Sequence, residues 1–415
     1  MYKRLNSVAL GLILSCGIIT TSSAFAQSYH PTDVQKPRSA TQRVAASKHR
    51  RSHNFTDFGK EYSYFKNHLQ DKYGLSYGLD ISFMPQYGSP NGKKTGFQTL
   101  IYPTVTWEAF NNEYGTATFN AAYNIARYSG RTAQDITDRI GAVTGINDYT
   151  SQSNSFDELY MTYQFPDKLS WLTLALGQFP IYNFDGSAYD ANQQENFINY
   201  SLSQNASSTY PTASMGGYVQ ISPNNKWSLA LGAQDAHNID GDGISTSHLT
   251  DDAHYTSFAS LTYSPTIKNL GDGQYSVLLY NQPYVDVQKE TTNGWSLNMN
   301  QNIGEKLAIF GRINGVTGST AEINRSYVLG AVYNNPLDRN PLDQIGLAVA
   351  YNEIDEDAVG EKLEHNAETI LEAYWALGIS KWMTITPDIQ FYINPALNTK
   401  SDYATAFTVR ASVFF

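Results

Sequence analysis

The chain ends in Phe407-Thr408-Val409-Arg410-Ala411-Ser412-Val413-Phe414-Phe415, and this stretch decides the fold. In an extended strand successive side chains point to opposite faces. One face of this strand is therefore apolar and the other is polar, a pattern that suits the wall of a membrane β-barrel between lipid and water. An ordinary half-buried soluble strand shows the same alternation. The apolar face carries Phe407, Val409, Ala411, Val413 and Phe415, and the polar face carries Thr408, Arg410 and Ser412.

The opposite end of the chain predicts export. Lys3 and Arg4 precede an apolar stretch at 8–19, and Ala24-Phe25-Ala26 forms a small-x-small cleavage site, so residues 1–26 are predicted to be a secretory signal peptide. The single cysteine, Cys16, lies within it, which leaves the mature chain without a disulfide. No later run of about 18 apolar residues follows. If the exported protein lies in a membrane, it is therefore expected to do so as a barrel.

Composition divides the mature chain further. The formal charge is −10, and removing Lys3 and Arg4 makes it −10 − 2 = −12. Residues 27–54 are nevertheless basic and lack an apolar pattern, which predicts a flexible periplasmic arm that is either solvated or in contact with anionic lipid or cell wall. Aromatic and leucine side chains then recur at helical spacing, which predicts an amphipathic helix at 55–70, ahead of a barrel at 71–415.

Sixteen alternating segments follow, an even number as single-chain barrels require. Each has roughly the length that a tilted membrane strand needs. The predicted strands are 75–87, 97–110, 115–127, 155–165, 171–181, 214–222, 226–236, 254–264, 274–285, 292–303, 306–316, 325–334, 342–353, 366–379, 382–394 and 404–415.

The connectors between these segments alternate in length. Short turns rich in Asn, Pro and Gly occupy every second connection, in agreement with turn chemistry. The longest connectors are 128–153, 182–213, 237–253 and 354–365, and all of them fall on the opposite side. A soluble sandwich has no reason to sort its connections in this way. The sorting is the strongest internal argument for an all-β, transmembrane antiparallel barrel.

The alternation also predicts which side chains face the lumen. Ionisable groups that face lipid cost a few kcal/mol near the midplane, so the polar face is expected to point inward. A barrel of this size leaves an aqueous channel unless loops fill it. The pore-lining candidates are Asp80, Glu108, Glu158, Gln220, Arg312, Glu368, Glu372, Tyr374, Asp388, Gln390 and Arg410. Such a mixture of charges, amides and phenols suits hydrogen bonding to sugar hydroxyls, but a non-specific pore has a similar lining.

The connector at 182–213 is too long for a simple link. Folded into the lumen it would narrow the pore, whereas on the surface it would be an exposed loop. The constriction candidates on it are Asp185, Asp190, Glu195, Asn196, Asn199 and Tyr210. A second loop, at Asn238 to Gly243, imitates the start of a calcium loop, but Leu249 stands where an EF-hand needs Glu. A plain turn-rich loop is therefore favoured, with a calcium site as the alternative; no metal and no cofactor is predicted.

Several of these segments resemble the carbohydrate-selective (OprB-type) porin family. They are 69–82 (LQDKYGLSYGLDIS), 196–199 (NFIN) with Tyr210-Pro211 and 216–218, and 385–395, whose Thr-Pro-Asp-x-Gln…Asn-Pro pattern is the most specific. The resemblance spans roughly 69–415 and implies a sixteen-stranded outer-membrane barrel in a Gram-negative bacterium that passes small carbohydrates by diffusion. The C-terminal Phe415 also resembles the signature by which the barrel-assembly machinery recognises such proteins.

The expected partners are therefore a small carbohydrate, outer-membrane lipid and lipopolysaccharide, and, as an open question, further copies of the chain; no nucleic acid is expected. A general diffusion porin and a polysaccharide exporter are the alternatives within transport. A barrel enzyme would need a nucleophile within hydrogen-bond reach of a histidine, and no such arrangement is apparent in the sequence, so no enzyme is predicted. A plugged, non-conducting adhesin is a third class.

Overall fold

The structure is a computed structural model that describes residues 57–90, 95–241, 243–244, 246, 249–250, 252–318 and 320–415. The predicted signal peptide at 1–26 and the basic arm at 27–54 lie outside these residues. The described chain starts with helix α3 (Asp57–Tyr73), and the first strand, β1, begins at Leu75.

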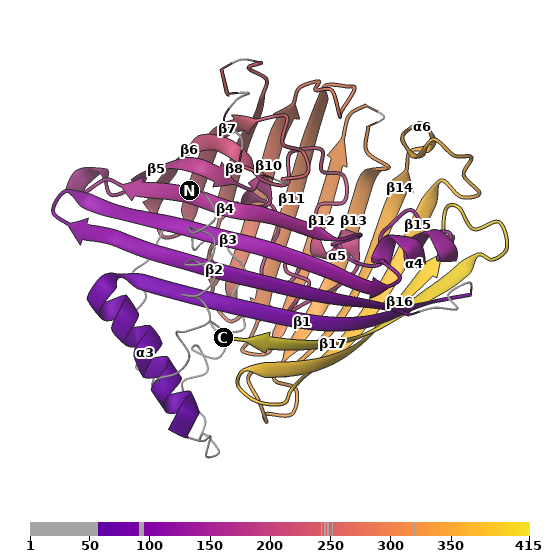
Figure 1. Cartoon of the computed structure of the whole chain (residues 1–415), viewed down its shortest axis with the longest axis horizontal. Coiled ribbons are helices and arrows are strands. Elements are labelled where there is room, and N and C mark those ends of the chain that lie inside the picture. The colour runs from indigo at the N-terminus through magenta and orange to yellow at the C-terminus, as the bar shows by residue number, and fades with distance from the viewer. Residues whose placement is uncertain are drawn as a thin grey trace, which may run out of the picture.

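Seventeen antiparallel strands form one sheet, and one of them, β9, has only two residues and lies in a turn. The sheet is closed because β1 pairs with β2 on one side and with β17 on the other, as Figure 1 shows. The strands are β1 (Leu75–Ser89), β2 (Gly96–Asn112), β3 (Gly115–Gly130), β4 (Ser153–Gln164), β5 (Leu172–Phe179), β6 (Ser214–Asn224), β7 (Trp227–Asp235), β8 (Tyr255–Tyr263), β9 (Thr266–Ile267), β10 (Gly271–Gln282), β11 (Thr292–Ile303), β12 (Leu307–Val316), β13 (Ile323–Asn334), β14 (Gln344–Ile354), β15 (Ala367–Gly378), β16 (Met383–Ile393) and β17 (Tyr403–Phe414).

The predicted all-β barrel of sixteen long strands is confirmed. The seam between its first and last strands is continuous up to the final residue, because Phe415 donates its N–H to Leu79 O (3.0 Å) and accepts from Leu79 N (3.2 Å). Closure leaves no unpaired sheet edge, which is the condition for a strand structure in lipid. The apolar face of the terminal strand therefore belongs to a complete wall.

The two ends of the barrel differ, as the connectors predict. Short turns occupy one end, which we call the turn side, and α3 lies there. The other end, the loop side, carries the long connectors with α4 (Ala133–Ile140), α5 (Tyr200–Ser203) and α6 (Glu356–Val359), and α4 and α6 lie opposite α3 in Figure 1. Short 3-10 helices at Asp167–Leu169 and Ile181–Phe184 complete the elements.

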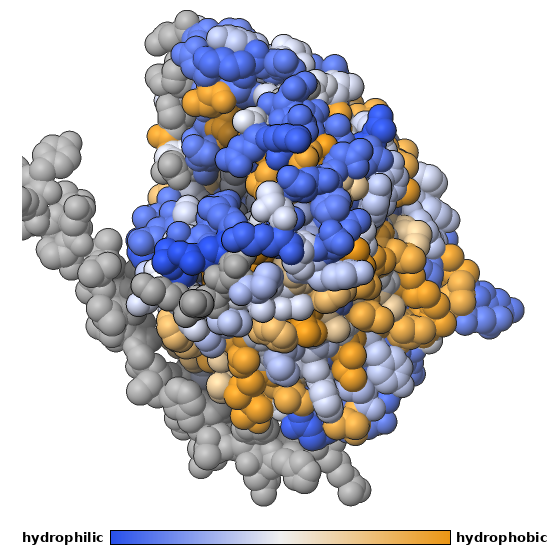
Figure 2. Space-filling model, turned by 90° about the vertical axis from the view of Figure 1, so that its right-hand side faces the viewer, coloured by the Kyte–Doolittle hydropathy of each residue, from blue (hydrophilic) through white to orange (hydrophobic). Residues whose placement is uncertain are grey.

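Outward and inward side chains alternate along the wall. Leu347 is 59% exposed, whereas its neighbour Ala348 is 3% exposed, although both are apolar and lie mid-strand. Large exposed apolar side chains on the outer face suit contact with hydrocarbon rather than with water. Figure 2 shows such a hydrophobic zone beside a broad hydrophilic region. Among the described helices, none is long and apolar enough to cross a membrane.

Candidate functional site

The connector at 180–213 folds into the barrel and packs against its inner wall. Phe197 is fully buried, and its ring lies 5.4 Å from that of Phe310 on β12 and 4.9 Å from that of Tyr374 on β15. Ile136 and Ile140 of helix α4 join the same buried cluster. Two loop-side connectors, 131–152 and 180–213, therefore share one apolar core with the wall of β12 to β17.

Two buried arginines bind the 180–213 loop to the wall. Arg312 of β12 forms an ion pair with Asp190 (Nη2–Oδ2 2.9 Å), and the two side chains are 1% and 0% exposed. Arg312 also donates to the Asp190 carbonyl oxygen at 2.5 Å. Arg410 of β17 donates to the carbonyl oxygens of Gln193 and Asn196. Because a guanidinium has several donors in a fixed plane, each arginine fixes a short stretch of loop backbone.

Two buried glutamates of β15 hold loop backbone in the complementary way, as acceptors. Glu372 accepts from the N–H groups of Ile198 (2.6 Å) and Asn199 (2.9 Å). Glu368 accepts from Val143 N and Thr144 N, both at 2.8 Å, in the other loop. These inward-facing side chains are covered by the loops that they anchor.

The other half of the loop packs against β4 to β10. The ring of Phe184 lies 4.9 Å from Phe258 and 5.0 Å from Tyr218. Next to it, Asp185 accepts hydrogen bonds from Asn205 (2.6 Å) in the loop and from Asn298 (2.9 Å) on β11. The strand residues that border the remaining open lumen belong to β1 to β4.

A cavity of about 450 Å³ occupies this part of the lumen and extends toward the turn side. We call it the turn-side cavity. Asp80 of β1, Tyr102 of β2 and Glu158 of β4 border it, together with Tyr182 and Asn183 of the loop. Lys66 of helix α3 also borders it, and its ammonium group lies 4.9 Å from the centre of the Tyr77 ring. The helix is thus positioned beside the turn-side mouth.

A second cavity of about 240 Å³, the loop-side cavity, lies next to the first and is bordered by Thr212 and Asp240. Five residues border both cavities and form what we call the shared ring: Asp148, Tyr149, Asp157, Tyr182 and Gln204. The shared ring combines two carboxylates, two phenols and an amide, brought together by β4 and by both inward-folded loops.

Negative charge predominates on both cavities. Asp80, Asp148, Asp157, Glu158, Asp185 and Asp240 border them, whereas Lys66 is the only lysine or arginine there among the described residues. Side-chain amides donate hydrogen bonds to three of these carboxylates: Asn124 to Asp157 (2.6 Å), Asn183 to Glu158 (2.8 Å) and Gln204 to Asp148 (3.1 Å). Burial raises the pKa of Asp148 to about 6, opposed by the hydrogen bond from Gln204. Acidic linings of this kind favour cations over anions.

The predicted site residues divide into those that border the cavities and those that are covered. Asp80, Glu158 and Asp185 border the turn-side cavity, and Tyr210 borders the loop-side cavity. Glu108 lies at the turn-side end of β2, where its N–H donates to Gly74 O (2.8 Å). The following face inward but are buried behind the loops or against the wall: Gln220, Arg312, Glu368, Glu372, Tyr374, Asp388, Gln390 and Arg410.

On the loop itself, the remaining candidates are buried and serve its internal structure or its attachment. Asn199 donates to Gly145 O (3.0 Å) of the neighbouring loop and to Tyr392 Oη (2.8 Å) of β16. Asn196 donates to the carbonyl oxygens of Ala188 and Ala191, at 3.3 and 3.2 Å. Glu195 is also buried and accepts from Asn192 at 3.4 Å, and Asp190 pairs with Arg312. Whether these residues set the width of a constriction stays a prediction.

None of the five members of the shared ring is among the site residues predicted from the sequence. Strict alternation sends Glu158 inward and Asp157 outward, but a β-bulge breaks the register of β3 and β4: Ala122 pairs with Glu158, and Tyr123 pairs with Phe156. Asp157 is left over and also turns inward, 3% exposed. Asp148 and Tyr149 lie in the 131–152 loop, where the isoleucines at 136, 140 and 146 were the available signal, because solvated loops rarely carry such side chains.

Known proteins resemble this chain over most of its length. The model of the carbohydrate-selective porin, OprB family, matches residues 115–415. Porin AaxA of Chlamydia felis is 37% identical over 365 residues, which cover 86% of this chain and 81% of that protein. Porin AaxA of Chlamydia pneumoniae is 38% identical over 348 residues, covering 81% and 78%.

Solved structures share the fold. The high-pH structure of Pseudomonas putida OprB superposes with a TM-score of 0.71 at 16% identity, covering 86% of this chain and 98% of that one. The low-pH structure of the same protein gives a TM-score of 0.54 at 13% identity, with 85% and 96% coverage. At these identities the likeness concerns the architecture of the barrel.

Proposed function

Because the chain belongs to the OprB family of carbohydrate-selective porins, and is therefore an outer-membrane porin of a Gram-negative bacterium, we propose that small carbohydrates diffuse through it. The family and fold are those of a channel rather than of an enzyme. The observation that carries the proposal is the shared ring, in which phenol, carboxylate and amide groups border both cavities.

The chemistry of this ring suits hydroxyl-rich solutes. The carboxylates of Asp148 and Asp157 accept hydrogen bonds, and the Gln204 amide both donates and accepts them. The rings of Tyr149 and Tyr182 offer flat apolar faces to the C–H face of a sugar. A solute crossing from the loop-side cavity would exchange water for these groups at one level of the lumen. We place the constriction there.

We also propose partners for the outer surface and for assembly. Outer-membrane lipid and lipopolysaccharide would surround the apolar outer face, and the barrel-assembly machinery would recognise Phe415 before β17 closes onto β1. The signal peptide at 1–26 would direct export, and the arm at 27–54 would lie in the periplasm. Association with further copies of the chain is testable by the mass of the purified protein in detergent.

A monosaccharide added to the wild-type channel in a planar bilayer is expected to lower its current saturably. Tyr182→Ala is expected to raise the half-blocking concentration about fivefold, because burying roughly 40 Å² of apolar sugar surface on the Tyr182 side chain contributes about 1 kcal/mol. Tyr284→Ala, which removes an exposed tyrosine between β10 and β11, is the matched control and is expected to behave like wild type. Wild-type channels that conduct but respond to no sugar would indicate a general diffusion porin.

A second candidate class is small organic cations, favoured by six carboxylates against one lysine on the two cavities. The same bilayer assay separates the two classes. Saturable block by a small organic cation, with none by neutral sugars, would assign the passage to cations. Equal block by neutral and by charged sugars would retain the carbohydrate proposal.

Acidification from pH 7 to pH 5 is expected to weaken the preference of the channel for cations. A carboxyl whose pKa is raised to about 6 is ionised at pH 7 and neutral at pH 5, so Asp148 loses its negative charge in this interval. The reversal potential in a KCl gradient measures the change. Asp148→Asn is expected to reduce the part of the pH response centred near pH 6, and an unaltered response in this variant would contradict the assignment.

A further inference from the structure

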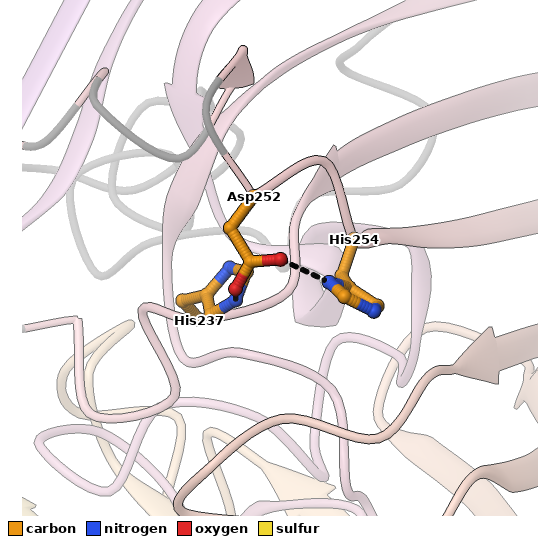
Figure 3. Close-up of side chains that lie close together, drawn as sticks. All are labelled: His237, Asp252 and His254. Carbon is orange, nitrogen blue, oxygen red and sulfur yellow. Dashed lines mark hydrogen bonds and ion pairs between the residues drawn. The ribbon is translucent and has the colours of Figure 1, made fainter.

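The connector at 236–254 brings two histidines and a carboxylate together on the loop side. His237 follows β7, while Asp252 and His254 precede β8, so the cluster lies at the base of this loop. His237 Nε2 lies 3.2 Å from Asp252 Oδ2, and His254 Nδ1 lies 3.1 Å from Asp252 Oδ1. Figure 3 shows the Asp252 carboxylate between the two rings. One ligand atom from each residue lies within 4.8 Å of the other two.

A fourth residue orients the first histidine. Asp235, the last residue of β7, is buried, and its Oδ1 lies 2.8 Å from His237 Nδ1 and accepts from His237 N at 3.0 Å. With Nδ1 as the donor to Asp235, the lone pair of Nε2 points at the Asp252 carboxylate. Two acceptors face each other at this distance only if a proton or a metal ion lies between them. Carboxylate support of the remote ring nitrogen is typical of metal-ligating histidines.

We propose that His237, Asp252 and His254 bind a divalent transition metal ion, with Zn²⁺ as the best match. Two imidazoles and a carboxylate are zinc ligands, and a water molecule would fill the fourth position of an open tetrahedral site. Metal–ligand bonds of about 2.0–2.1 Å place tetrahedral ligand atoms roughly 3.4 Å apart. Each histidine has one Asp252 oxygen near that spacing, Oδ2 at 3.2 Å from His237 and Oδ1 at 3.1 Å from His254, and one ligand atom from each of the three residues lies within 4.8 Å of the other two. Asp252 and His254 are 60% and 44% exposed, so an ion reaches them from outside.

The position of the cluster links the metal to the mouth of the passage. Thr212, at the end of the 180–213 loop, donates its N–H to Ile239 O (2.8 Å), and Asn238 donates to Ala213 O (2.8 Å). Asp240, in the same segment, borders the loop-side cavity. An ion that joins His237 to Asp252 and His254 would close the base of the 236–254 loop and hold this segment in place. The metal site would thus stabilise the loop and would not form part of the permeation route.

Titration of the full chain with metal tests the proposal directly. The protein is purified without a polyhistidine tag, stripped with EDTA and dialysed, then titrated with Zn²⁺ by calorimetry and with Co²⁺ by visible absorption. We expect one saturable site that is lost in His237→Ala and in His254→Ala, with an intense tetrahedral Co²⁺ spectrum in the wild type. Asp235→Asn is expected to weaken binding 10- to 100-fold.

His365→Ala is the matched control, because His365 also lies in a loop-side connector and beside a carboxylate, with Nε2 3.4 Å from Asp402 Oδ1. It is expected to retain the wild-type affinity. The heat-dependent gel migration of the barrel confirms that each variant is folded. Equal Zn²⁺ binding in wild type and in the His237→Ala/His254→Ala double variant would overturn the proposal. The absence of saturable binding in the folded wild type would do the same.

Discussion

Replacing Arg312 with alanine is expected to release the 180–213 loop from the wall and to enlarge the single-channel conductance. The substitution leaves Asp190 buried without its cation, and an uncompensated buried charge of this kind costs about 3–5 kcal/mol. This cost disfavours the inward-folded position of the loop in the variant but not in the wild type. Conductance in a planar bilayer and protease sensitivity within 180–213 report the change.

Two comparison variants test this prediction. Arg325→Ala removes the cation of the exposed Arg325–Glu353 pair (3.3 Å; 59% and 33% exposed) and is expected to cost at most about 1 kcal/mol. Conversely, the Asp190→Ala/Arg312→Ala double variant is expected to be less destabilised than Arg312→Ala, because no charge is left unpaired. An Arg312→Ala channel with wild-type conductance and an intact loop would show that the apolar contacts of Phe197 alone hold it.

Neutralising the shared ring with Asp148→Asn and Asp157→Asn is expected to abolish most of the preference for cations. A unit charge about 4 Å from an ion is worth about 1 kcal/mol in water and more in a narrow lumen, which makes each carboxylate worth about fivefold in the cation-to-anion permeability ratio. The reversal potential under a KCl gradient at pH 7.5 measures this ratio. Asparagine keeps nearly the same shape, so the change isolates charge.

Asp272→Asn is the control, since Asp272 lies at the turn-side end of β10, where it accepts from Thr266 (2.8 Å), and does not border either cavity. It is expected to leave the permeability ratio unchanged. If the double variant and the control shift the reversal potential equally, selectivity arises from the overall field of the protein rather than from the ring.

The strands were predictable because their signals are local. Alternation with period two and turn residues at the ends are properties of a dozen neighbouring residues, so the predicted 292–303 agrees with β11 (Thr292–Ile303), and 404–415 agrees with β17 (Tyr403–Phe414) within one residue. The inward direction of Arg312, Glu372 and Arg410 followed from the same alternation. Which inward residues border open space did not follow from it.

The sequence by itself thus determined that this protein is a barrel with an apolar outer face, polar inward side chains and its long connectors at one end. Only the tertiary structure decided where the lumen is open. Loops distant in sequence cover one part of the wall, as the Arg312–Asp190 contact across 122 residues shows, and a bulge turns Asp157 inward against the alternation. The local backbone sets whether a side chain points inward or outward. Its exposure to the lumen depends on which distant segment fills the space in front of it.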